Sequence, residues 1–225
     1  MCFGGCHMYK LVDNVEEYRV HAAICRKPLD VAIDGLRKEL QCKVDLQPIG
    51  NQKLILMLKN QKGTYYFDYH IVLTKMPMKI EPRELRSFID GAIQEYCKAR
   101  KDTIRKNRAD HLRYTFTTVK GERFVLNVEI LCCTPSKYKR LVYNKEKRSY
   151  GWSTMVGKCR DIRTRIHRVQ KYNVEEELRQ IYLAKKNASY QKGEETLSLP
   201  LLKQACVEVM HLVHRKQFLK NKELE

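Results

Sequence analysis

The order of helical and strand-like segments is the feature that most constrains the fold of this chain. Residues with helical spacing cover 14–42, 81–101, 155–187 and 197–220. Strand-like runs cover 44–50, 54–59 and 65–75, and a two-strand hairpin is expected at 113–133. Because strands do not alternate regularly with helices, this order disfavours a doubly wound parallel sheet. It predicts an α+β fold with a small mixed, mostly antiparallel sheet, flanking helices and a helical C-terminal part.

The helical segments carry apolar residues that predict which faces are buried. The first segment is expected to pack through Val20, Ile24, Val31 and Leu36. Pro28 is expected to kink that helix or to divide it, because proline removes a backbone donor. The segment 81–101 is the clearest amphipathic helix, with a proline in its first turn.

The charge of the chain predicts a polyanionic partner. The formal net charge is +18 in 225 residues, which is typical of proteins that contact nucleic acid or phosphates. Between Lys137 and Lys171 there are twelve Lys and Arg residues and two acids. We therefore divide the chain into an α+β core at 1–140 and a basic helical part at 141–225, packed on that core.

Cationic and aromatic side chains of the second half are the candidate nucleic-acid contacts, because aromatic rings among cations can stack on bases while the cations contact phosphates. A solvated basic helix face and a core role for Trp152 are the alternatives. The candidates are Lys137, Lys139, Arg140, Lys147, Arg148, Trp152, Arg160, Arg163, Arg165 and Arg168.

Cysteine usage and hydropathy indicate a cytoplasmic protein. There are nine cysteines, none in a C-x-x-C pair, and the N-terminus lacks the pattern of a secretory signal. No apolar run is long enough for a membrane span. Cys2, Cys6 and His7 could share a metal ion, although no second ligand pair stands at zinc-site spacing.

Polar residues on two strands form the candidate site. In the strand 65–75, Tyr66, Asp68 and His70 fall on one face. In the hairpin, Asn127 and Glu129 also share a face. If the two strands are neighbours, these polar side chains converge, close to the turn at Gly50 and Asn51.

This arrangement resembles the nucleotidyltransferase superfamily, which includes DNA polymerase β and the cyclic GMP-AMP synthase-like enzymes. The resemblance spans about 44–133, and the basic tail around 141–187 is similar to the C-terminal helical part of some bacterial and phage members. It implies that Asp68, Asn127 and Glu129 occupy catalytic positions, with Asp68 and Glu129 as ligands of Mg²⁺ or Mn²⁺. It also implies that Gly50, Asn51 and His70 lie at the nucleotide.

The chain departs from the family pattern at the acidic positions. The family has a Gly-Ser turn, an acid-x-acid strand and a third acid, whereas this chain has Gly50-Asn51 and a single acid, Asp68, in the strand. Depending on the register, either Tyr66 replaces the first acid or His70 replaces the second. The third position is Asn127, or Glu129 after a shift of two residues. Because two Mg²⁺ ions need several carboxylates, Asp68, His70 and Glu129 form either a reduced metal site or a lost one.

Three functions are compatible with these patterns. The favoured interpretation is a nucleotidyltransferase-like protein that has lost catalysis and binds RNA or DNA, as a subunit of a ribonucleoprotein or other complex. The alternative is an active, metal-dependent enzyme that moves a nucleoside monophosphate from NTP to a nucleic-acid or nucleotide acceptor. The third is an unrelated basic RNA-associated protein.

Overall fold

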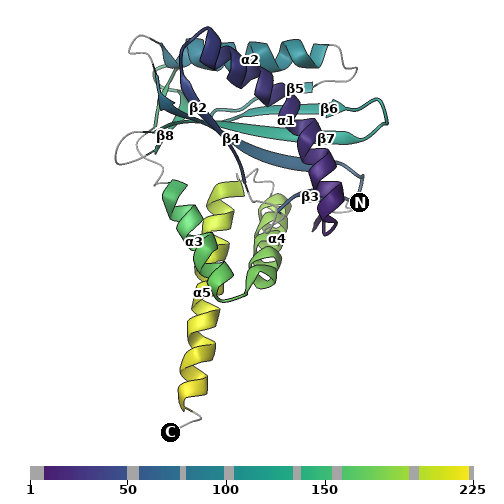
Figure 1. Cartoon of the computed structure of the whole chain (residues 1–225), viewed down its shortest axis with the longest axis vertical. Helices are drawn as coiled ribbons and strands as arrows, with labels where there is room; N and C mark the ends of the chain where they lie inside the picture. Colours follow the sequence, from purple (N-terminus) through teal and green to yellow (C-terminus); the bar gives the residue numbers. More distant parts are fainter. Residues whose placement is uncertain are drawn as a thin grey trace.

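The computed structural model describes residues 8–49, 56–76, 80–98, 104–133, 138–153, 159–192 and 198–222. Within these ranges the chain forms five helices and nine strands (Figure 1). The helices are α1 (Val15–Lys38), α2 (Pro82–Lys98), α3 (Cys159–Lys171), α4 (Glu175–Gln191) and α5 (Ser198–Lys222). The strands are β1 (Tyr9–Leu11), β2 (Lys43–Pro48), β3 (Leu58–Asn60), β4 (Tyr65–Lys75), β5 (Ile104–Asn107), β6 (Leu112–Thr117), β7 (Arg123–Cys133), β8 (Tyr138–Asn144) and β9 (Ser149–Trp152).

Strands β4 and β7 form the centre of a single mixed sheet. They are parallel, whereas the other strand pairs are antiparallel. The main path runs β1-β3-β4-β7-β6-β5, while β2 also pairs with β4 and β8 extends from β7 to β9. A parallel pair needs a long crossover, and here α2, β5 and β6 lie between β4 and β7 in the chain. The predicted α+β class with a mostly antiparallel mixed sheet is confirmed.

Helices α1 and α2 cover one face of this sheet (Figure 1). Residues at alternate positions of the central strands, such as Phe67 and Ile71 of β4 and Leu126 of β7, pack against buried residues of both helices. Alternation along a strand sends the intervening residues to the other face. The polar residues at positions 68, 70, 127 and 129 are therefore directed away from α1 and α2.

Helix α1 differs from its prediction in continuity and in its buried face. It runs unbroken through Pro28, which is itself buried, and Asn14 caps its first turn by accepting from the N–H groups of two glutamates. Val20 and Val31 are 50% and 47% exposed, so their prediction as apolar anchors is wrong. The buried stripe passes instead through His21, Cys25, Pro28, Leu29, Ala32, Ile33 and Leu36.

Helices α3, α4 and α5 pack together on the other side of the sheet and form a second apolar cluster (Figure 1). The prediction of one helix over 155–187 is wrong, because the chain turns between α3 and α4. Asn173 adopts a left-handed conformation there, with φ of 51°, which asparagine tolerates better than most residues. Among the helices that the structure describes, none combines the length and apolar character that a membrane crossing needs.

The polar stretch after the predicted hairpin contains two strands that the sequence patterns did not indicate. Strand β8 pairs with the end of β7, and β9 returns antiparallel along β8. Sheet pairing thus continues to Trp152, and α3 begins at Cys159. The division of the chain into 1–140 and 141–225 stays a prediction.

Candidate functional site

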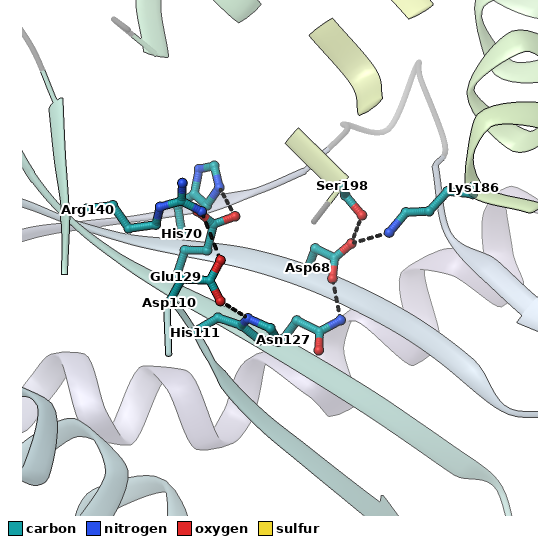
Figure 2. A network of polar contacts seen from close by, with 9 residues as sticks. All are labelled: Asp68, His70, Asp110, His111, Asn127, Glu129, Arg140, Lys186 and Ser198. Carbon is teal, nitrogen blue, oxygen red and sulfur yellow. Dashed lines mark hydrogen bonds and ion pairs between the residues drawn. The ribbon is translucent and has the colours of Figure 1, made fainter. Parts of the chain in front are cut away.

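The parallel pairing of β4 and β7 brings the predicted site residues side by side. Asp68 lies opposite Asn127, and His70 lies opposite Glu129, in one continuous register. All four side chains belong to the sheet face that turns away from α1 and α2. Figure 2 shows these residues meeting side chains from β8, α4 and α5. The predicted convergence therefore exists, although its chemical composition differs from three clustered acids.

Each oxygen of the Asp68 carboxylate has a polar neighbour. The Asn127 side chain donates from Nδ2 to Oδ1 at 2.6 Å. The hydroxyl of Ser198, the first residue of α5, donates to Oδ2. Lys186 of α4 places its Nζ 4.0 Å from the same oxygen. Two helices distant in sequence thus complete the environment of this strand residue (Figure 2).

Glu129 belongs to a second polar group, which is more deeply buried. Its Oε1 lies 3.4 Å from His70 Nε2, and its Oε2 lies 3.5 Å from Arg140 Nη1. Arg140 also contacts Asp110 at 3.3 Å, and His111 Nδ1 lies 2.8 Å from the other Asp110 oxygen. Glu129 is therefore placed between an imidazole and a guanidinium rather than beside Asp68 in open solvent.

Burial and neighbouring charges shift several pKa values around these groups. Burial lowers the pKa of Lys186, while the adjacent Asp68 carboxylate opposes that shift. Burial, together with Asp68, raises the pKa of Tyr182 well above its usual range. The hydrogen bond with His111 holds the pKa of Asp110 low, and the charge of Arg140 acts in the same direction.

In the register that places Tyr66 at the first acidic position, the residue at that position is a packed tyrosine. The Tyr66 ring meets the Tyr9 ring edge-on, with centroids 4.9 Å apart. Asn60 donates from Nδ2 to the Tyr66 hydroxyl at 3.2 Å. In the other register His70 stands at the second acidic position, and it is 2% exposed. Both side chains have structural partners where the family pattern needs a carboxylate.

These contacts do not fit a two-ion metal centre. A centre of that kind needs several oxygen ligands with negative charge, whereas the oxygens of Asp68 and Glu129 face an amide N–H, a hydroxyl, an imidazole and two cationic side chains. Among the described residues, no group of three or more His, Cys, Asp or Glu side chains could hold a metal ion. The cavity beside Asp68 has a volume of about 10 Å³, which is room for about one water molecule.

The remaining predicted residues are dispersed. Gly50, Asn51, Lys137 and the Cys2, Cys6 and His7 group lie outside the described residues. Arg160 and Arg163 belong to α3, but their side chains are also outside the described part.

The cations that the structure does describe divide between two surfaces and the interior. Lys139, Lys147 and Arg148 are exposed on β8 and the turn that follows it, and Arg168 is exposed on α3. Arg165 of α3 is half-buried. Arg140 points inward to Glu129, and Trp152 is partly buried against the first core.

The sequence patterns missed Lys186 and Ser198. Ser198 is separated from Asp68 by 130 positions. Neither residue lies in the strand patterns from which the site was predicted, so no local sequence pattern identifies them as neighbours of Asp68. Lys186 lies within a charged helical stretch, where a solvated lysine is the ordinary expectation.

The α+β fold, with its polar face on β4 and β7, is similar to the fold of cyclic GMP-AMP synthase-like nucleotidyltransferases. Solved structures of DncV share this fold. The Vibrio cholerae DncV in its 3'-deoxy GTP bound form superposes with a TM-score of 0.56 at 12% identity, covering 86% of this chain and 65% of that chain. The 3'-deoxy GTP bound form of Escherichia coli DncV superposes with a TM-score of 0.57 at 12% identity, covering 86% of this chain and 67% of that chain.

A further Vibrio cholerae DncV structure, described as a cyclic AMP-GMP synthase and a prokaryotic cGAS homolog, gives a TM-score of 0.52 at 10% identity. It covers 77% of this chain and 61% of that chain. The chain thus spans about two thirds of the length of these proteins. Neither the family models nor the curated proteins contain a match. At this level of identity the likeness shows the fold alone.

Proposed function

We propose that this protein is a nucleotidyltransferase-like protein that has lost catalysis and binds nucleic acid. One observation carries the first half of the proposal: the Asp68 carboxylate is bound by Asn127, Ser198 and Lys186. Lys186 brings a positive charge from within the protein to the acid that would otherwise bind a metal cation. Transfer chemistry in this family would need that acid to be available for a metal ion.

The second half of the proposal is supported by charge. A net charge of +18 favours association with polyanions, and exposed cations lie on the β8–β9 turn and on α3. RNA and DNA are both compatible with this surface. A protein partner within a larger ribonucleoprotein remains part of the proposal.

Nucleotide incorporation tests the loss of catalysis. The protein would be incubated with each α-³²P-labelled NTP, with Mg²⁺ or Mn²⁺ and with nucleic-acid or nucleotide acceptors. Asp68→Ala serves as the site variant, and Asp45→Ala, an exposed acid on β2, serves as its matched control. We expect no labelled product from any of the three proteins.

Incorporation by the wild type and by Asp45→Ala that disappears in Asp68→Ala would overturn the proposal. That result would establish the alternative, a metal-dependent enzyme that moves a nucleoside monophosphate from NTP to an acceptor. Mg²⁺ or Mn²⁺ belongs to that alternative only.

Binding measured against salt tests the nucleic-acid half. For a duplex, the logarithm of the affinity should fall with the logarithm of the salt concentration by about 0.9 for each phosphate neutralised. A response that does not depend on salt, or the absence of any binding at low salt, would contradict the proposal.

A further inference from the structure

An open groove is lined by residues of α3 and α5, none of which belongs to the Asp68 site. Its volume is about 450 Å³, within the range of pockets that hold small ligands. Arg165 lines it from α3, and α5 contributes the other side chains. These are Lys203, Gln204, Val207, Glu208 and His211.

The groove is electropositive. Lys203 and His211 stand on the same stripe of α5, two turns apart, and Arg165 faces them from α3. The acid in the groove, Glu208, is paired with Lys185 of α4 at 2.6 Å, so its charge is compensated from outside the groove. An anionic group in the groove would therefore meet two permanent cations and a histidine.

The floor between these cations is apolar. Val207 lies midway between Lys203 and His211 on the α5 stripe and is 38% exposed. An anion alone would leave this surface in water. A ligand with both a phosphate and a flat, weakly polar ring complements the groove. Its phosphate contacts the cationic side chains while its ring covers the apolar surface of Val207.

We infer that this groove receives a nucleotide unit of single-stranded nucleic acid. The inference rests on the proposed function and specifies where it occurs. A single strand fits better than a duplex, because unstacked bases can turn toward a protein surface while paired bases in a helix cannot. The phosphate lies between Arg165 and Lys203, and the base covers Val207.

Fluorescence anisotropy with a labelled twelve-nucleotide oligo(U) tests the inference. The groove variant is Arg165→Gln combined with Lys203→Gln, and the matched control is Lys10→Gln combined with Lys27→Gln, whose lysines are exposed on β1 and α1. We expect the groove variant to lose at least tenfold in affinity and the salt slope to become shallower by about one to two units. The control variant should change affinity less than twofold.

Val207→Asp provides a second variant that removes no cation. It places a carboxylate at the floor and should weaken oligo(U) binding at least fivefold. Circular dichroism melting would establish that each variant is folded. An oligo(U) that contains 4-thiouridine should also photocrosslink to peptides of α3 or α5 in the wild type.

The outcomes separate the inference from the proposed function. If all groove variants bind oligo(U) as the wild type does, and the crosslinks lie outside α3 and α5, the groove is not the binding site. Nucleic-acid binding by the protein would then still stand. No binding by the wild type overturns both. Tighter binding of polyglutamate than of oligo(U), lost in the groove variant, assigns the groove to an acidic protein and overturns the inference.

Discussion

At the scale of single residues, the site depends on how the Asp68 charge is balanced. Asp68 and Lys186 are partly shielded from water, with side chains 17% and 13% exposed. Removal of one member of a shielded pair leaves the other uncompensated and is destabilising. Removal of both costs less than the sum. The pair is therefore suited to a double-mutant cycle.

We expect Lys186→Met to lower the free energy of unfolding by about 1–3 kcal/mol. Asp68→Asn combined with Lys186→Met should cost less than the two single changes added together, with a coupling of about 0.5–2 kcal/mol. Urea unfolding of the four proteins measures this. Strict additivity would mean that the two charges do not interact.

The second residue-scale prediction concerns the pH dependence of stability around Asp110. Because the pKa of Asp110 is held low in the folded state by His111 and Arg140, its ionised form stabilises the fold. This contribution to stability is fully present above the pKa of an aspartate in the unfolded chain, about 4. It is lost as pH falls through the pKa of Asp110 in the folded state.

Urea midpoints of the wild type and Asp110→Asn would therefore differ most at pH 6 and converge below about pH 4. Asp45→Asn, which changes an exposed acid, should follow the wild type throughout. A difference between wild type and Asp110→Asn that grows toward low pH would have the wrong sign for this explanation.

At the scale of elements, hydrophobic periodicity predicted the secondary structure correctly where a segment has one buried face. It failed where tertiary contacts determine which residues are buried or where a helix ends. The strand 65–75 and the strands of the hairpin matched because alternation and a glycine turn determine them locally. The buried face of α1 was predicted wrongly because apolar spacing favoured the face with Val20 and Val31. The face that is in fact buried includes His21 and Pro28, which such a pattern does not count as core residues. The turn at Asn173 lacks both glycine and proline, so the sequence offered little sign of it.

The site itself was predictable only in part, for the same reason. The facing of Asp68 and Asn127 follows from two strand patterns once the strands are neighbours. Ser198 and Lys186 reach Asp68 only through the packing of α4 and α5 against the sheet. No periodic pattern encodes contacts of that kind.

A matched pair of substitutions on α1 tests the corrected buried face. Leu29 is fully buried whereas Val20 is half exposed. Leu29→Ala should lower the free energy of unfolding by about 2–5 kcal/mol, and Val20→Ala should change it by less than about 0.5 kcal/mol. Denaturant titration of both variants measures the difference. Similar decreases in the free energy of unfolding at the two positions would favour the buried face that was expected from the sequence.

At the scale of the whole molecule, the net charge makes salt act in two opposite directions. Repulsion among the excess cations destabilises the compact free protein, and salt screens that repulsion. Salt also competes with phosphates for the same cations. The free protein should therefore become more stable as salt rises, while its complex with nucleic acid becomes weaker.

Thermal melts in 50 and 500 mM NaCl, with and without oligo(U), measure both effects. We expect Tm of the free protein to rise by a few degrees, since screening relieves repulsion. The increase in Tm produced by oligo(U) should be larger at 50 mM than at 500 mM. A Tm of the free protein that falls with salt would mean that attractive ion pairs outweigh the excess positive charge.

The long sequence separations at Asp68 also have a consequence for the order in which the molecule is made. Asn127 follows Asp68 by 59 positions and Ser198 follows it by 130. At roughly 5–20 residues per second, synthesis of that interval takes on the order of ten seconds. Until that interval has passed, a nascent chain lacks the α5 hydroxyl that later donates to the Asp68 carboxylate. Asp68 thus acquires its last hydrogen-bond partner only once the start of α5 has been synthesised.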